Sequence, residues 1–196
     1  NVSSSVAGIS FDYHSTHYQI PVIGEYNLEN ALAVINLALR YLKPQQIAEA
    51  LQSFQAPKGR MEIVQTTPFS VIIDFAHTPG ALRKALSAVA AIKKPDSRLI
   101  TVFGCAGKRD KSRREMGAVS AELADITVLT AEDPRDERLS QVNDDIITHA
   151  TTKQGKLLHR FATSTDYKLH GETNYAAEID ATLASGGKPL FAFDED

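Results

Sequence analysis

The sequence predicts an α/β protein built on a mostly parallel sheet. From about residue 58 onward, short apolar strand segments alternate with amphipathic helical segments, a pattern typical of βαβ units with right-handed crossovers. Three apolar segments also run directly into loops of glycine, proline and charge: VIIDF into AHTPG, LITVF into GCAGKRD, and ITVL into TAEDPRDE. Parallel strands end at one edge of a sheet, and ligands bind outside that edge. We therefore predict that Asp74, Arg109 and Arg135 face one shared pocket.

Composition limits the classes of protein to consider. The 196 residues, 43% hydrophobic and 23% charged, are typical of a globular chain with one or two domains. A formal net charge of -3 argues against a nucleic-acid partner, so any anion must be recognised locally. The single cysteine, Cys105, excludes an internal disulfide and favours a reducing compartment. No stretch approaches the roughly 20 apolar residues of a membrane span. We expect a cytoplasmic protein without membrane partners.

The first third of the chain predicts short strands followed by a helix pair. Residues 1–23 are rich in β-formers, and Pro21 confines that stretch to an edge or a strand start. From Asn27 apolar residues recur at three- and four-residue steps until Pro44, which predicts a helix that ends there. A second amphipathic helix is expected around residues 47–54. The breaker-rich APKG segment then places a domain boundary between residues 57 and 58.

The remaining residues, 58–196, predict the alternating α/β domain. Strands are expected over 61–65, 70–75, 98–103, 126–130, 156–161 and 188–193, and helices over 79–92, 112–124, 139–151 and 173–184. Thr78 before Pro79 is a favourable helix start, because a hydroxyl N-cap precedes the residue that best tolerates the first helical position. The sequence begins at Asn1 and stops after FAFDED. Both ends read as cuts, and we expect a piece of a longer protein.

Asp74 lies at the end of a predicted buried strand, where a carboxylate is costly unless donors surround it. A ribose diol would supply two donors. Backbone amides of the turn at 76–79 would serve equally well, and spacing alone leaves both readings open. His77 could meet a phosphate or could close the same turn.

The loop GCAGKRDKSRRE combines two glycines with five basic residues. Its glycines would let backbone amides approach an anion at a helix N-terminus. Cations at that position are unfavourable by roughly 0.3 to 1 kcal/mol each, so a bound anion is the simplest explanation. The alternative is a solvated helix face partly neutralised by Asp110 and Glu115. The spacing is neither a dinucleotide fingerprint nor a Walker A loop, so chemistry on ATP by this chain alone is not expected.

The loop TAEDPRDER places Arg135 among acidic residues. Such a loop could hold a zwitterion, with carboxylates on an ammonium group and Arg135 on a carboxylate. It could equally be a solvated loop whose members pair with one another. The six histidines and Cys105 show no metal-ligand spacing, and no catalytic triad can be argued. We therefore assign no metal ligands and no catalytic residue.

Read in order, GEYNLENALA, APKGRMEIV, DFAHTPGAL, VFGCAGKRDKSRREMG and TAEDPRDE resemble motifs of the Mur ligases of peptidoglycan synthesis. The chain is most similar to the members that add the third residue of the stem peptide. The resemblance implies that residues 1–57 are the C-terminal part of the central ATPase domain. Residues 58–196 would then be the Rossmann-like C-terminal domain, truncated at its end. The sequence contains no P-loop.

This resemblance implies an ATP-dependent carboxylate–amine ligase that serves the cell wall, cell shape and cell division. ATP would phosphorylate the terminal carboxylate of UDP-MurNAc-dipeptide, and the amine of a diamino acid would attack the acyl phosphate. ATP and Mg²⁺ are the implied cofactors, with most Mg²⁺ ligands outside this sequence. We expect a monomer, and we expect this chain alone to be inactive.

The resemblance also implies roles for eight residues. Asn27 and Asn30 would contact the adenine, Arg60 and Asp74 the ribose, and His77 the phosphates; Arg109, Asp133 and Arg135 would bind the incoming amino acid. Lys108 replaces an acid of the family pattern and Asp133 replaces an asparagine, which leaves the third residue open between meso-diaminopimelate and lysine. The competing interpretations are a folylpolyglutamate synthetase-like or other Mur-type ligase, a non-catalytic nucleotide-binding module, and a Rossmann oxidoreductase, for which no fingerprint is present.

Overall fold

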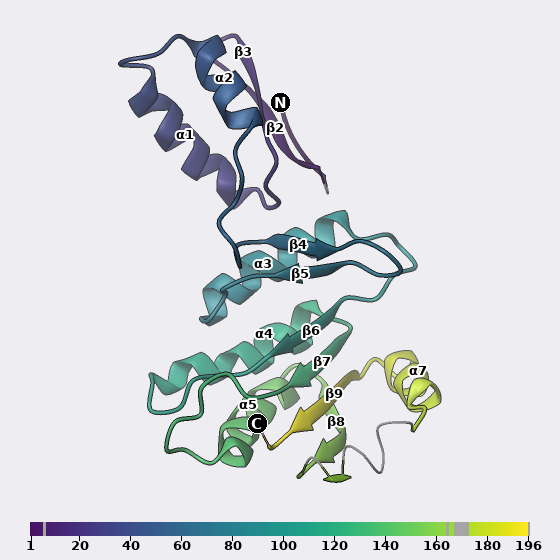
Figure 1. Ribbon diagram of the computed structural model, residues 1–196. Coiled ribbons are helices and arrows are strands. Elements are labelled where there is room, and N and C mark those ends of the chain that lie inside the picture. Colours follow the sequence, from purple (N-terminus) through teal and green to yellow (C-terminus); the bar gives the residue numbers. More distant parts are fainter. Residues whose placement is uncertain (6, 164, 167–172, 196) are drawn as a thin grey trace. The chain divides into compact units, whose positions relative to one another are not determined.

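A computed structural model describes residues 1–5, 7–163, 165–166 and 173–195 (Figure 1). The chain divides into two compact units. Unit 1 comprises Asn1–Ala76 and Ser87–Ile92, and unit 2 comprises His77–Leu86 and Lys93–Asp196. Within the described residues, every helix is too short or too polar to serve as a membrane span.

Unit 1 begins with a three-stranded antiparallel sheet and two helices. The strands are β1 (Val2–Ser5), β2 (Gly8–Tyr13) and β3 (Thr16–Ile20), and the helices are α1 (Tyr26–Ala38) and α2 (Pro44–Gln52). Alternate residues of β2 and β3 point into the core, so that Phe11 and Tyr18 stack with ring centroids 5.6 Å apart. The predicted strands and helix pair are confirmed. The predicted end of the first helix is wrong, because α1 stops at Ala38 and Pro44 instead opens α2, where its missing N–H costs nothing.

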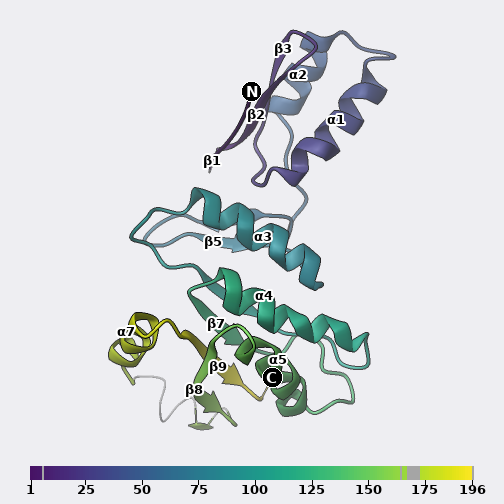
Figure 2. The same cartoon turned by 180° about the vertical axis from the view of Figure 1, so that it is seen from behind.

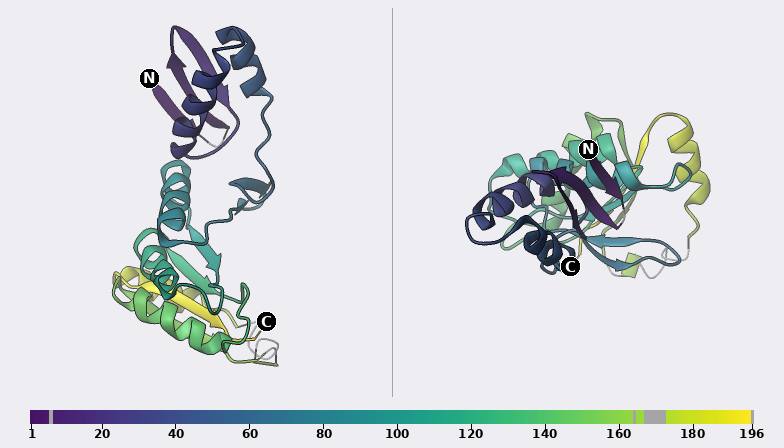
Figure 3. Two further views of the ribbon diagram at one scale, coloured as in Figure 1. Left: turned by 90° about the vertical axis from the view of Figure 1, so that its left-hand side faces the viewer. Right: turned by 90° about the horizontal axis from the view of Figure 1, so that it is seen from above.

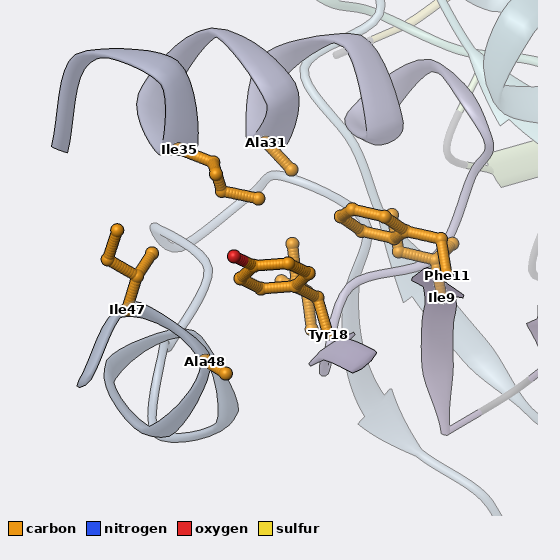
Figure 4. Packing of buried hydrophobic residues seen from close by; sticks show 8 residues of the cluster. Ile9, Phe11, Tyr18, Ala31, Ile35, Ile47 and Ala48 are labelled. Carbon is orange, nitrogen blue, oxygen red and sulfur yellow. The ribbon is translucent and has the colours of Figure 1, made fainter. Parts of the chain in front are cut away.

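Tyr18 is fully buried between the two helices and the sheet, and Figure 4 shows its hydroxyl oxygen among Ile35 and Ile47. Among the described residues, this hydroxyl has no hydrogen-bond partner. An unpaired buried hydroxyl is destabilising, so Tyr18→Phe should raise the free energy of unfolding, by about 1 kcal/mol. The control is Tyr13→Phe, which removes an exposed hydrogen bond to Asn36 (2.9 Å) and should lower it. Urea denaturation checks both signs, and a loss of stability in Tyr18→Phe would contradict this reading.

The next two strands, β4 (Glu62–Gln65) and β5 (Val71–Ile73), form a separate antiparallel pair. We predicted β5 as a member of the parallel sheet, but within the described residues its only hydrogen-bonded partner strand is β4. The connection between them is too short for the crossover of a dozen or more residues that parallel strands need. The two strands therefore pair as an antiparallel hairpin.

Unit 2 contains a four-stranded parallel sheet in the order β6-β7-β9-β8, seen from two opposite sides in Figures 1 and 2. Its strands are β6 (Ile100–Phe103), β7 (Ile126–Leu129), β8 (Gly155–Phe161) and β9 (Lys188–Phe193). The helical elements are η1 (Lys111–Glu115), α4 (Met116–Leu123), α5 (Leu139–Thr151) and α7 (Ala176–Ala184), while α3 (Pro79–Ile92) contributes residues to both units. The predicted alternation and parallel pairing are confirmed.

Helices cover both faces of this sheet. On one face α4 and α5 lie side by side (Figure 3). Gly117 of α4 allows the two helices to approach closely, because a Cβ at this position would lie 2.9 Å from the Ile146 side chain of α5 and closer still to the Ile146 carbonyl oxygen. Ser120 of α4 and Thr127 of β7 share a buried hydrogen bond of 2.7 Å. On the other face, residues of α7 pack against Phe161 and Phe191. Two helix boundaries differ from prediction: the segment at 112–124 opens with the 3₁₀ turn η1, and α7 begins at Ala176 rather than 173; residues 167–172 lie outside the described part.

Candidate functional site

Asp74 follows β5 and is bound by two backbone amides of unit 1. Its Oδ2 accepts the Met61 N–H at 2.9 Å and its Oδ1 accepts the Ala76 N–H at 3.0 Å. The turn-amide reading of Asp74 is thus observed, with Met61 as an additional donor that the sequence did not suggest. A carboxylate has about four acceptor positions. The two amides therefore leave acceptor capacity for hydroxyl donors of a ligand.

A small cavity of about 170 Å³ adjoins Asp74. It is lined by Lys58, Gly59, Arg60, Ile73, Asp74 and Phe75. The Arg60 guanidinium lies over the Phe75 ring, 4.5 Å from its centroid, a cation–π contact. The structure therefore brings together Arg60 and Asp74, two of the predicted site residues. Sequence reasoning missed Lys58 and Phe75, although an exposed aromatic after a strand was visible in DFAH.

The predicted adenine contacts lie at the start of α1. The Asn27 side-chain amide donates to the Ile23 carbonyl at 2.9 Å, and Asn30 donates to the Asn27 side-chain oxygen at 3.2 Å. Asn27 thus helps to hold the turn before α1. Burial raises the pKa of neighbouring Tyr26, and the Asp74 carboxylate raises it further. The contact of Asn27 and Asn30 with an adenine base stays a prediction.

His77 lies at the beginning of unit 2, directly before the N-cap of α3. The Thr78 hydroxyl accepts the Ala81 N–H at 3.3 Å, and the Thr78 carbonyl accepts the Leu82 N–H at 2.9 Å. This confirms the predicted hydroxyl N-cap ahead of Pro79. The phosphate contact of His77 stays a prediction.

The glycine loop (residues 104–110) and the arginine loop (residues 130–138) follow the neighbouring parallel strands β6 and β7. Both glycines face the arginine loop: a Cβ on Gly104 would lie 2.8 Å from the Glu132 nitrogen, and one on Gly107 would lie 2.7 Å from the Pro134 carbonyl carbon. The Gly107 N–H donates to the Asp133 carbonyl at 2.8 Å. The predicted convergence of these two loops is confirmed. The Gly107 amide, however, donates its hydrogen bond to the arginine loop. Contrary to the prediction, it is not available to bind an anion.

Two of the five basic residues of the glycine loop and η1 form ion pairs with carboxylates of the same chain. Asp110 caps η1 by accepting the Ser112 N–H at 3.0 Å, and this amide holds the pKa of Asp110 below its usual value. The Lys108 ammonium pairs with Asp136, and buried Arg114 pairs with Glu137 at 3.0 Å. These pairs account for part of the positive charge, and contact of the cluster with a bound anion stays a prediction. Arg109 is exposed and, in the described part of the chain, forms no ion pair.

In the arginine loop, Arg135 pairs with a near neighbour, because its Nε donates to Asp133 Oδ2 at 3.2 Å. The reading in which members of this loop pair with one another is thus observed. Arg135 is still more than a third exposed, so that its guanidinium has further donors for a ligand. That Asp74 shares a pocket with Arg109 and Arg135 stays a prediction.

Comparison with known proteins identifies similar sequences. The chain is 39% identical to a UDP-N-acetylmuramoyl-L-alanyl-D-glutamate--2,6-diaminopimelate ligase of Chlorobaculum tepidum, over 74% of the chain and 29% of that protein. It is 43% identical to the ligase of the same name from Trichormus variabilis, over 66% of the chain and 27% of that protein. The chain therefore spans less than a third of the length of these relatives.

Solved structures show the same fold. A UDP-N-acetylmuramate-alanine ligase MurC of Thermotoga maritima matches 98% of the chain, and the chain covers 40% of it, with a TM-score of 0.61 at 19% identity. A Mycobacterium tuberculosis folylpolyglutamate synthase complexed with ADP and AMPPCP matches 98% of the chain, and the chain covers 41% of that protein. The TM-score is 0.60 at 18% identity. Residues 59–185 match the family described as "Mur ligase, glutamate ligase domain". This match covers well over half of the sequence, and the chain therefore belongs to the Mur ligase family.

Proposed function

We propose that the chain is part of an ATP-dependent amide ligase that adds a diamino acid to UDP-MurNAc-dipeptide in peptidoglycan synthesis. The observation that carries the proposal is the convergence of the glycine and arginine loops, which places Arg109 and Arg135 at one edge of the parallel sheet. Two guanidinium groups at one sheet edge suit a substrate with two carboxylates. We favour meso-diaminopimelate over lysine for this reason, and the names of the relatives point the same way.

In the proposed reaction, a carboxylate oxygen of the dipeptide attacks the γ-phosphorus of ATP and ADP leaves. The amine of the diamino acid then attacks the acyl carbon, loses a proton and displaces phosphate, which leaves an amide. We assign Asn27 and Asn30 to the base, Arg60 and Asp74 to the ribose, and His77 to the phosphates. Arg109, Asp133 and Arg135 are assigned to the amino acid, and we assign residues 1–57 to the central domain and 58–196 to the C-terminal domain.

The chain's own contribution is to position reactants rather than to activate phosphate. Holding an amine beside an acyl phosphate replaces a bimolecular encounter, an effect that reaches roughly 7 to 11 kcal/mol in favourable cases. The described residues contain no cluster of three His, Cys, Asp or Glu side chains suited to a metal ion. We propose that other parts of the full-length protein hold the Mg²⁺ ion.

The test is an assay of the full-length protein with ATP, UDP-MurNAc-dipeptide and either meso-diaminopimelate or lysine. Amide product and ADP in equal amounts with one diamino acid are expected. Amide formation only with a folate and glutamate would favour the folylpolyglutamate synthetase-like alternative. Nucleotide binding without any amide would favour the non-catalytic module.

Arg135→Ala should raise the KM for the diamino acid and leave the KM for ATP within about twofold. Loss of a hydrogen bond to a charged group costs about 1.5 to 3 kcal/mol, or roughly 10- to 100-fold in KM. Arg83→Ala serves as a control, because Arg83 pairs with Glu122 through two bonds of 2.9 Å away from both loops. Initial rates at varied concentrations of each substrate provide the measurement. An equal rise in both KM values would contradict the role assigned to Arg135.

A further inference from the structure

Glu137 connects the two loops that carry the proposed amino-acid contacts. One carboxylate oxygen, Oε1, accepts the backbone N–H of Lys108 at 2.6 Å, and the other, Oε2, accepts the Arg114 Nη2 at 3.0 Å. Lys108 directly precedes Arg109, and Glu137 itself follows Arg135 by two residues. One side chain thus ties the glycine loop to the arginine loop next to both candidate arginines.

The backbone on each side of this bridge has an unusual conformation. Lys108 has a φ of 49° and Arg135 a φ of 54°, in the left-handed region that non-glycine residues seldom adopt. Such residues persist only where surrounding contacts fix them. At Lys108 those contacts are the Glu137 carboxylate on the backbone and the Asp136 carboxylate on the ammonium group. Loss of the bridge would therefore free the backbone that directs Arg109.

The bridge is anchored in the body of unit 2 by Arg114, which is only 2% exposed. Its Nε lies 3.9 Å from Asp145 of α5, and among the described residues neither Nε nor Nη1 has a hydrogen-bond partner. A buried guanidinium with so few partners depends strongly on those it has. The Arg114–Glu137 pair is therefore anchored in the interior of unit 2 and is not a solvent-exposed surface contact.

The charge state of the bridge follows from its surroundings. The Lys108 amide holds the pKa of Glu137 below its ordinary value of 4.5, and Arg114 and Lys111 contribute in the same direction. A lowered carboxyl pKa means that the contact is complete above the ordinary value and is lost as the pH falls through the lower, folded-state pKa. The carboxylate is thus charged at neutral pH.

We propose that Glu137 is a positioning residue that sets the spacing of Arg109 and Arg135 for the incoming amino acid. The inference rests on the amino-acid role proposed above for those two arginines. Glu137 itself does not contact the substrate. It acts by holding the two loops at a fixed separation, so that both guanidinium groups can contact one substrate molecule.

The experiment measures steady-state kinetics of Glu137→Gln in the full-length protein. Glutamine keeps the size but replaces one charged acceptor by a donor that cannot serve both Lys108 and Arg114. We expect the KM for the diamino acid to rise about tenfold, while the KM for ATP stays unchanged. Glu122→Gln is the matched control, since it removes an exposed carboxylate paired with Arg83, and it should leave both constants unchanged. An unchanged KM for the diamino acid in Glu137→Gln would overturn the inference.

A double-substitution cycle separates positioning from general stabilisation. If Glu137 acts through the Lys108 backbone on Arg109, then Glu137→Gln combined with Arg109→Ala should raise the KM by less than the product of the separate effects. A full product would overturn the inference. Should Glu137→Gln fold poorly, Arg114→Lys decides, because it keeps the buried charge and should raise the KM for the diamino acid at least threefold; an unchanged KM there also overturns it. Absence of amide formation by the wild type with either diamino acid would instead refute the proposed function.

Discussion

Gly107→Ala should lower the free energy of unfolding of unit 2 by about 1 to 3 kcal/mol, the range of overpacked interiors. The added Cβ would lie 2.7 Å from the Pro134 carbonyl carbon and closer still to its oxygen. Both are backbone atoms of the arginine loop, which cannot rotate away as a flexible side chain would. The loop must shift, and the hydrogen bond from the Gly107 N–H to the Asp133 carbonyl is expected to break with it. Thermal and urea denaturation measure the loss.

Gly80→Ala is the matched control for this substitution. Gly80 lies in the first turn of α3, and a Cβ there would have no heavy atom within 4 Å. Alanine is the better helix former, so we expect a stability between unchanged and about 1 kcal/mol higher. Equal stability of the two variants would show that the loops tolerate a wider separation. The contact through Gly107 would then have no role in holding them.

Asp74→Ala should destabilise unit 1 by about 3 kcal/mol, since two hydrogen bonds to a charged acceptor are lost at roughly 1.5 kcal/mol each. The Met61 and Ala76 amides would lose their acceptor, and Met61 already has a φ of 49°. The same substitution should weaken ATP binding by the full-length protein, if the proposed ribose contact is correct. Denaturation and nucleotide titration measure the two effects separately.

Asp74→Asn distinguishes these roles further. An asparagine offers one acceptor oxygen but turns its amide group toward the second N–H donor, so we expect about half the loss seen with alanine. Asp12→Ala is the control in the same unit, because Asp12 forms an exposed pair with His17 and should change stability by less than about 0.5 kcal/mol. A stability of Asp74→Ala equal to that of Asp12→Ala would contradict the structural role of Asp74.

Much of the fold was predictable from local sequence features. The observed bounds of α3, α5 and β9 agree with the predicted segments 79–92, 139–151 and 188–193. Their residues follow a regular period, and Thr78 with Pro79 marks a helix start by local chemistry. The antiparallel pairing of β5 with β4 was missed because strand partners depend on contacts between segments. A period-two pattern does not identify the neighbouring strand.

The site was predictable only where topology alone decides it. The sequence located the loops of Arg109 and Arg135 correctly, since consecutive βα units place their loops at one sheet edge. Glu137 and Arg114 were missed because the partners are 23 residues apart, and no spacing rule links them. For the same reason, the internal ion pairs of the basic cluster were not foreseen. Its carboxylate partners Asp136 and Glu137 come from the following loop.

The left-handed backbone at Lys108 and Arg135 lowers the stability of the protein but holds the loops that are proposed to give substrate selectivity. Each such residue stores strain of roughly 1 to 3 kcal/mol, which glycine in the same place would relieve. Relief would also loosen the segments that are proposed to choose the amino acid. Directed evolution for heat tolerance alone should therefore accumulate glycines at these positions and broaden the range of accepted substrates.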